Sequence, residues 1–227
     1  TLVLLSLFSQ KMMGYTSTLA GLALAPGGLA TMLVMPMVAR LILKMNAKYL
    51  LAGSIAGIAT ATFLMGRFSL FVDFPGIMWP RVVLGVGLAC LFVPLTGLTL
   101  RQLPNEEMGN ATAIYNLLRN LGGSVGIAFV TTMIARGAQI HQTYLASHVT
   151  IFDRAYQWYQ GFSSPLQGGG SPAGAHALLY GRLLREANML SFNDAFLMLS
   201  GLMVLVLPLV FFMKRIRFGR QEPITGE

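Results

Sequence analysis

Residues 77–100 read IMWPRVVLGVGLACLFVPLTGLTL, and this stretch decides the class of fold. Its 24 residues include a single charged side chain, Arg81. A helix of that length rises about 36 Å at 1.5 Å per residue, which is enough to cross a hydrocarbon core of about 30 Å. The stretch is therefore expected to form a transmembrane helix.

The composition of the whole chain also indicates an integral membrane protein. Of its 227 residues, 55% are hydrophobic and 11% are charged, whereas soluble domains carry about 25% charged residues. The net charge is +8. Because the basic residues lie mostly at the ends of apolar runs, they indicate positive-inside topology and not nucleic-acid binding. The single cysteine, Cys90, excludes an internal disulfide.

Apolar runs of spanning length predict an all-α membrane fold with five full transmembrane helices, at residues 17–42, 49–66, 77–100, 111–135 and 192–213. The opening run TLVLLSLFSQ is about half a span. We therefore expect a C-terminal piece of a longer protein. Residues 1–135 would hold one truncated helix and four full ones, and 191–213 the last of six.

The segment 136–190 is expected to be a long loop outside the membrane, with amphipathic helices and a Gly/Pro linker. Lys and Arg are denser on the opposite side of the membrane: eight in about 33 residues, against six in about 72. This asymmetry places the basic tail, 214–227, in the cytoplasm and the long loop on the extracellular or periplasmic side.

Polar residues interrupt the run 111–135, where residues 116–126 read NLLRNLGGSVG. Thr112, Asn116, Arg119 and Asn120 recur at three- and four-residue spacing and share one helix face. An arginine at depth costs about 2.5–3.5 kcal/mol against lipid. The stripe is therefore a candidate lining of a transport pathway. The alternative is that Arg119 caps neighbouring carbonyls or extends to the cytoplasmic interface.

Arg81 is the second intramembrane arginine, and it is followed by Gly85 and Gly87. Small residues let helix backbones approach closely within a membrane, so this helix is expected to pack tightly. Arg81 is a candidate coupling residue. Because it lies near the expected outer surface, its side chain could also extend to the interface.

Pro26, Pro36 and Pro94 are expected to interrupt their helices, either as gates or as ordinary kinks. Asp194, in SFNDAF at the expected start of the last span, is a candidate proton or cation site, with use as an N-cap as the alternative. The sequence shows no catalytic residues, no cofactor motif and no metal site. His141 and His148 are isolated loop residues in this interpretation.

Four motifs carry a family resemblance over nearly the whole chain: GYTSTLAGLALAPGGLATMLVMPMVARLI, LRQLPNEEMGNATAIYNLLRNLGGSVGIAF, NMLSFNDAF and PRVVLGVG. They resemble the C-terminal half of major facilitator superfamily exporters, of the fourteen-helix EmrB/QacA type of drug:proton antiporter. The last motif resembles the superfamily's Arg-x-x-x-Gly-x-Gly element, which the resemblance carries onto Arg81, Gly85 and Gly87.

The resemblance implies a proton-coupled multidrug efflux transporter in the inner (plasma) membrane, which exports amphipathic compounds by alternating access together with its N-terminal half. It places the proton-coupling carboxylate in that half. It also implies a periplasmic adaptor protein and an outer-membrane channel as partners. The adaptor would meet the aromatic part of the loop, which holds Tyr144, Tyr156, Trp158 and Tyr159; the alternative is that these rings rest on the bilayer. Other readings are an exporter of a specific metabolite or chelate, or a membrane assembly subunit without transport.

Overall fold

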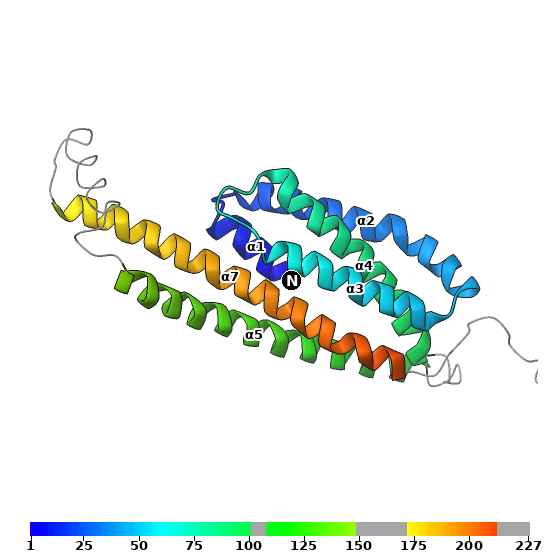
Figure 1. Ribbon diagram of the computed structural model, residues 1–227. Helices are drawn as coiled ribbons and strands as arrows, with labels where there is room; N and C mark the ends of the chain where they lie inside the picture. Colours follow the sequence, from blue (N-terminus) through cyan, green and yellow to red (C-terminus); the bar gives the residue numbers. More distant parts are fainter. Residues whose placement is uncertain (101–107, 149–171, 213–227) are drawn as a thin grey trace, which may run out of the picture.

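The computed structural model describes residues 1–100, 108–148 and 172–212, and over these ranges it is helical apart from short turns (Figure 1). Its elements are α1 (Leu2–Lys11), α2 (Ser17–Lys44), α3 (Ala47–Met65), α4 (Phe74–Leu100), α5 (Met108–His148) and α7 (Pro172–Phe212). Five of these helices are long and apolar enough to cross a membrane, and α1 is a shorter apolar helix. The predicted all-α, multi-pass membrane fold is confirmed.

The last two helices are longer than the spans expected from the sequence. Each has 41 residues, so α5 continues past 135 and α7 begins 20 residues before 192. The expected Gly/Pro linker is thus helical from Pro172 onward. The extension is held by packing, since Ala187 and Met189 are buried. The rest of that linker, the rings of Tyr156, Trp158 and Tyr159, and the basic tail lie outside the described residues.

The long helices pack as a row in the order α2, α4, α3, α7, α5, and the short α1 also packs against α2 (Figure 1). Helix α5 packs mainly on α7 and touches α4. This order leaves α2 and α5 at the two edges of the row. In Figure 1 the α5–α7 pair also projects past the other helices at one end.

An aromatic cluster joins α1, α7 and the turn after α3. The ring of Phe8 lies 5.5 Å from that of Phe68 and 5.8 Å from that of Phe192, measured between centroids. Two polar contacts close this end of the bundle: Arg185 Nη2 donates to the carbonyl oxygen of Met12 at 2.7 Å, and Asn193 Nδ2 to that of Phe68 at 2.9 Å. These contacts connect α1 and the turns at this end of the bundle to α7.

The prolines do not interrupt their helices as expected. Pro26 and Pro36 lie inside a continuous α2, and Pro94 lies fully buried inside a continuous α4. Transmembrane helices tolerate proline where neighbouring helices and local adjustments satisfy the freed backbone groups. The idea that these residues are gates remains a prediction.

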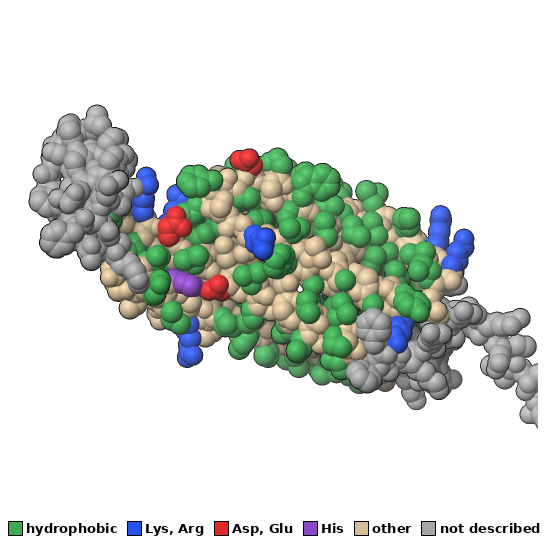
Figure 2. Space-filling view, viewed as in Figure 1, with side chains coloured by type: hydrophobic (Ala, Val, Ile, Leu, Met, Phe, Trp, Pro, Cys, Tyr) green, Lys and Arg blue, Asp and Glu red, His purple; other side chains and the backbone are tan. Residues whose placement is uncertain are grey.

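Large apolar side chains are exposed on every long helix that the structure describes. Figure 2 shows hydrophobic side chains spread over the face in view, with Lys and Arg side chains mostly toward the two ends. On α2, Met32 and Leu33 are about three-quarters exposed. Exposed apolar surface on this scale fits a lipid environment or contact with further protein.

Candidate functional site

Arg81 is buried between α2 and α4, with 4% of its surface exposed. Its side chain lies directly over Gly27, where an added Cβ would come within 2.7 Å of Arg81 Cγ and 2.8 Å of its Nε. The Nε and Nη1 atoms are buried and have no hydrogen-bond partner in the part of the chain that the structure describes. The expectation that Arg81 could extend to the interface is therefore wrong, because the neighbouring backbone encloses it.

Gly85 and Gly87 allow α4 to approach two neighbours. A Cβ on Gly85 would lie 2.2 Å from the carbonyl oxygen of Gly27 in α2, and one on Gly87 would lie 2.8 Å from Ile58 in α3. Thr31 Oγ1 reinforces the first contact, since it lies 2.8 Å from the Gly27 oxygen and 3.0 Å from the Gly85 oxygen. The expected tight packing is present at both glycines.

The polar stripe of α5 lies near the edge of the row of helices. Asn116, Arg119 and Asn120 are exposed, and Thr112 is half-buried, with its hydroxyl donating to the Met108 carbonyl at 2.7 Å. The Arg119 guanidinium lies over the Phe92 ring of α4, 4.4 Å from its centroid. This cation–π contact keeps Arg119 on the α4 side of the helix. A role in a pathway stays a prediction.

Asp194 lies within α7 and not at its start, so the N-cap alternative is wrong. Its Oδ2 atom lies 2.6 Å from His141 Nε2 on α5, and its side chain is 60% exposed. Beyond this pair, Gln142 Nε2 donates to the Tyr180 hydroxyl at 3.0 Å. These two contacts join α5 to α7 near the far end of α5 from the polar stripe.

A groove lies beside this contact between His141 and Asp194. We call it the α5–α7 groove; its volume is about 500 Å³, and its wall includes Phe129, Met133, Arg136, Ile140, His141 and Asp194. At its inner edge the two helices touch closely, since Ser191 Oγ donates to the Ile134 carbonyl at 2.6 Å. The groove thus combines an apolar wall with charges of both signs.

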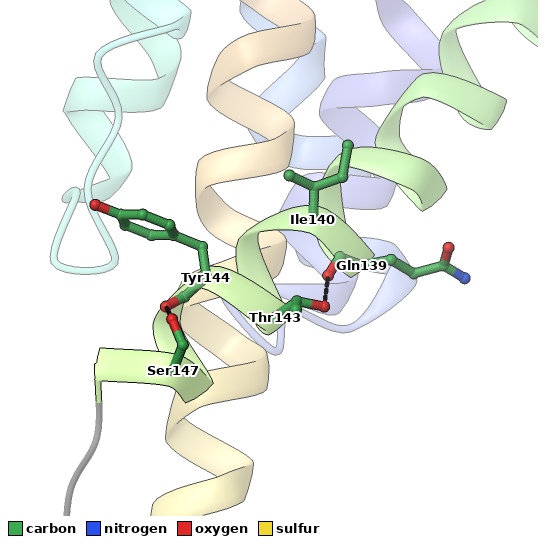
Figure 3. A pocket seen from close by; sticks show the side chains of 5 residues that line it. All are labelled: Gln139, Ile140, Thr143, Tyr144 and Ser147. Atoms are coloured by element: carbon green, nitrogen blue, oxygen red, sulfur yellow. Dashed lines mark hydrogen bonds between the residues drawn. The ribbon is translucent and has the colours of Figure 1, made fainter.

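Another hollow is a shallow surface of α5 alone (Figure 3). Among its residues, the Thr143 hydroxyl donates to the Gln139 carbonyl and the Ser147 hydroxyl to the Tyr144 carbonyl. Because these hydroxyls bond to their own helix, this hollow presents few free polar groups. Among the described residues there is also no cluster of three or more potential metal ligands.

The predicted site residues fall into three separate places. Arg81 and Gly85 lie at the α2–α4 contact, the polar stripe lies on α5, and Asp194 lies at the α5–α7 contact. Sequence reasoning missed His141, which it assigned to a loop, and Gly27, whose lack of a side chain makes room for Arg81. Recognising that residues 136–148 continue α5 would have placed His141 on a helix.

Comparison with known proteins identifies the family. The family model described as Major Facilitator Superfamily matches residues 1–127, more than half of the chain. The chain belongs to the Major Facilitator Superfamily. The resemblance seen in the sequence is thus confirmed at the level of the superfamily.

Within the Major Facilitator Superfamily, the chain is similar to drug-resistance proteins. It is 32% identical over 215 residues to "Multidrug export protein EmrB" of Escherichia coli K12, a match that covers 94% of this chain and 41% of that protein. It is 30% identical over 214 residues to "Fatty acid resistance protein FarB" of Neisseria gonorrhoeae, covering 94% of this chain and 42% of the relative. The chain therefore spans about two fifths of the length of these curated relatives.

Proposed function

We propose that this chain is the C-terminal part of a proton-coupled multidrug efflux transporter, which exports amphipathic compounds by alternating access. The observation that carries the proposal is the similarity to a multidrug export protein over 94% of the chain. The transporter would lie in the inner membrane with its C-terminus in the cytoplasm, as the distribution of Lys and Arg favours. In this role the protein binds and releases its substrates without chemical change and needs no cofactor.

The exposed polar stripe on α5 supports a pathway role for Asn116, Arg119 and Asn120. In a bilayer, exposed polar and charged groups at this depth would face lipid at a cost of about 2.5–3.5 kcal/mol for the arginine alone. That cost disappears if the N-terminal half of the transporter covers the stripe and leaves water between the two halves. The stripe would then line one wall of the substrate path.

Proton coupling would depend on a carboxylate elsewhere in the transporter. The described residues hold three carboxylates, Asp73 before α4 and Glu186 and Asp194 in α7, and all three side chains are exposed. We therefore place the coupling carboxylate in the N-terminal half. Arg81, which has two buried and unpartnered nitrogen atoms, is the candidate in this half for responding to a change of charge nearby.

A periplasmic adaptor and an outer-membrane channel are the proposed protein partners. In this arrangement the segment between α5 and α7 faces the periplasm and meets the adaptor through its aromatic residues. The projection of α5 and α7 past the other helices supports this, because it sets the end of α5 and the start of α7 apart from the rest of the bundle (Figure 1).

Resistance measurements on a deletion strain test the function. The full-length gene should restore growth on the lipophilic cation tetraphenylphosphonium, and it should lower the energy-dependent accumulation of that cation in cells. The name of the relative from Neisseria gonorrhoeae favours fatty acids as a second substrate class, so oleate belongs in the same panel. Protection against oleate alone would replace multidrug export with export of a specific metabolite. Protection against neither would favour a membrane assembly subunit without transport.

A further inference from the structure

The lining of the α5–α7 groove changes from apolar to charged along its length. Along α5, its wall runs from Phe129 and Met133 to Arg136 and then to His141, which pairs with Asp194 of α7. The distance from Phe129 to His141 along the helix is roughly 18 Å at 1.5 Å per residue. The apolar end lies toward the hydrophobic middle of the helix, and the charged end lies toward the projecting end. The groove is therefore amphipathic in the same direction as a lipid-like molecule.

Its two permanent charges have opposite signs and are both accessible. Arg136 is exposed, and the Asp194 side chain is 60% exposed although it contacts His141. Asp194 repels a purely anionic ligand, and Arg136 repels a purely cationic one. A ligand that carries one charge of each sign meets a partner for both.

We propose that the α5–α7 groove binds a zwitterionic amphiphile. Its anionic group lies on Arg136, its ammonium group on Asp194, and its apolar part against Phe129 and Met133. The ammonium takes the place of His141 as the partner of Asp194, so ligand binding exchanges one partner of this carboxylate for another. The hydrogen bond between Gln142 and Tyr180 continues to hold the two helices together beyond the ligand.

Two kinds of molecule share this chemistry: a membrane phospholipid with a primary ammonium group, and a zwitterionic drug. The proposal rests on the groove and on the membrane location of the chain, and it does not depend on transport. The groove could therefore be occupied even if the proposed export function fails. Binding is accordingly the quantity to measure.

Native mass spectrometry of the delipidated full-length protein tests the proposal. The probes are phosphatidylethanolamine, which carries both charges; phosphatidylglycerol, which carries the phosphate without an ammonium; and dioleoyl-trimethylammonium-propane, which carries only a cation. We expect phosphatidylethanolamine to be retained in preference to both. Asp194→Asn and Arg136→Gln should each lower its retention about tenfold, as expected for loss of one charge-assisted contact. His141→Gln should maintain or raise retention, because it frees the Asp194 carboxylate.

Matched controls keep these results specific. Glu186→Gln removes an exposed acid from α7, and Arg67→Gln removes an exposed base outside the groove, so neither should change retention. Thermal unfolding of each variant verifies that it is folded. Equal retention of the three probes, unchanged retention in Asp194→Asn, or loss of binding in His141→Gln would each overturn the proposal.

Competition then identifies the source of the ligand. Norfloxacin, a zwitterionic drug, is added to protein loaded with phosphatidylethanolamine. If norfloxacin displaces the lipid from the unmodified protein but not the lipid that remains bound to the Asp194→Asn variant, drugs share the groove. Retention of the lipid at saturating norfloxacin would identify the phospholipid as the occupant. A protein that retains neither molecule after delipidation would refute the site.

Discussion

Gly85 of α4 lies so close to Gly27 of α2 that a Cβ atom on Gly85 would stand 2.2 Å from the Gly27 carbonyl oxygen. No side chain fits between these backbones, and Thr31 Oγ1 lies within hydrogen-bond distance of both carbonyl oxygens. The Arg81 side chain also packs directly against Gly27. One contact between two glycines therefore fixes both the register of α2 against α4 and the position of a buried arginine.

Substitution of Gly85 by alanine should weaken the α2–α4 contact. The added methyl group meets backbone atoms that cannot move away independently, so we expect a loss of about 1–3 kcal/mol. The measurement is the thermal unfolding temperature of the full-length protein in detergent. Gly28→Ala is the matched control, because nothing lies within 4 Å of a Cβ at that position. Equal unfolding temperatures for the two variants would contradict the contact.

Replacement of Thr31 by valine should also destabilise the protein, by about 1 kcal/mol, since it removes the hydroxyl that lies between the two helices while keeping the shape of the side chain. Thr60→Val is a suitable control because the Thr60 hydroxyl is exposed and bonds to the Ala56 carbonyl of its own helix. The same unfolding assay applies. A larger loss in the Thr60 variant would show that the interhelical bond contributes little.

Arg81→Met should leave the protein as stable as before or more stable. The buried Nε and Nη1 atoms lack partners in the described residues, and each unsatisfied buried donor costs about 1–3 kcal/mol. At the same time we expect export of tetraphenylphosphonium to fall, because Arg81 is the candidate coupling residue. A marked fall in the unfolding temperature would show that another part of the transporter supplies a partner for the guanidinium.

Cysteine labelling can establish which face of α5 lines water. In full-length protein that lacks its native cysteines, Asn116→Cys and Arg119→Cys should react with a membrane-impermeant maleimide, and Leu117→Cys should not. The reason is that the polar stripe and the apolar side chains occupy different faces of the same helix. Reaction at Leu117→Cys alone would show that the water-filled path lies along the face of Leu117 and not along the polar stripe.

Replacement of residues 149–162 by a flexible linker should abolish co-purification of the adaptor and leave membrane insertion intact. The exchange begins after residue 148, because residues 138–148 belong to α5 and include His141, which contacts Asp194 of α7. Shortening residues 163–171 is the control and should have little effect. If the adaptor still co-purifies after the first change and is lost after the second, residues 163–171 and not residues 149–162 would make the contact.

The apolar runs were sufficient to predict the membrane class and the bounds of α2, α3 and α4 to within about three residues, because polar residues flank them in the sequence. They were not sufficient for α5 and α7. Beyond residue 135 the sequence becomes polar, which resembles a loop, yet His141 and Asp194 show that the helices continue side by side. Interhelical contacts stabilise these turns, and a single sequence does not display them.

The site was predictable to a similar extent. The glycine at position 85 was expected to permit close packing, and it does. The burial of Arg81 was not expected, because it depends on Gly27, which lies 54 residues away in the chain and contributes only the absence of a side chain. Local patterns can reveal which residues are unusual for a membrane helix, but the neighbours that enclose them come from the tertiary fold.

The length of the α5–α7 pair has a mechanical consequence. A continuous helix of 41 residues extends about 60 Å, roughly twice the thickness of the hydrocarbon core. A tilt of about 10° within the bilayer would therefore swing the far end of the pair by about 5 Å, as a lever pivoting at the membrane surface. Whatever binds at that end would sense the conformation of the membrane domain directly, without a separate relay.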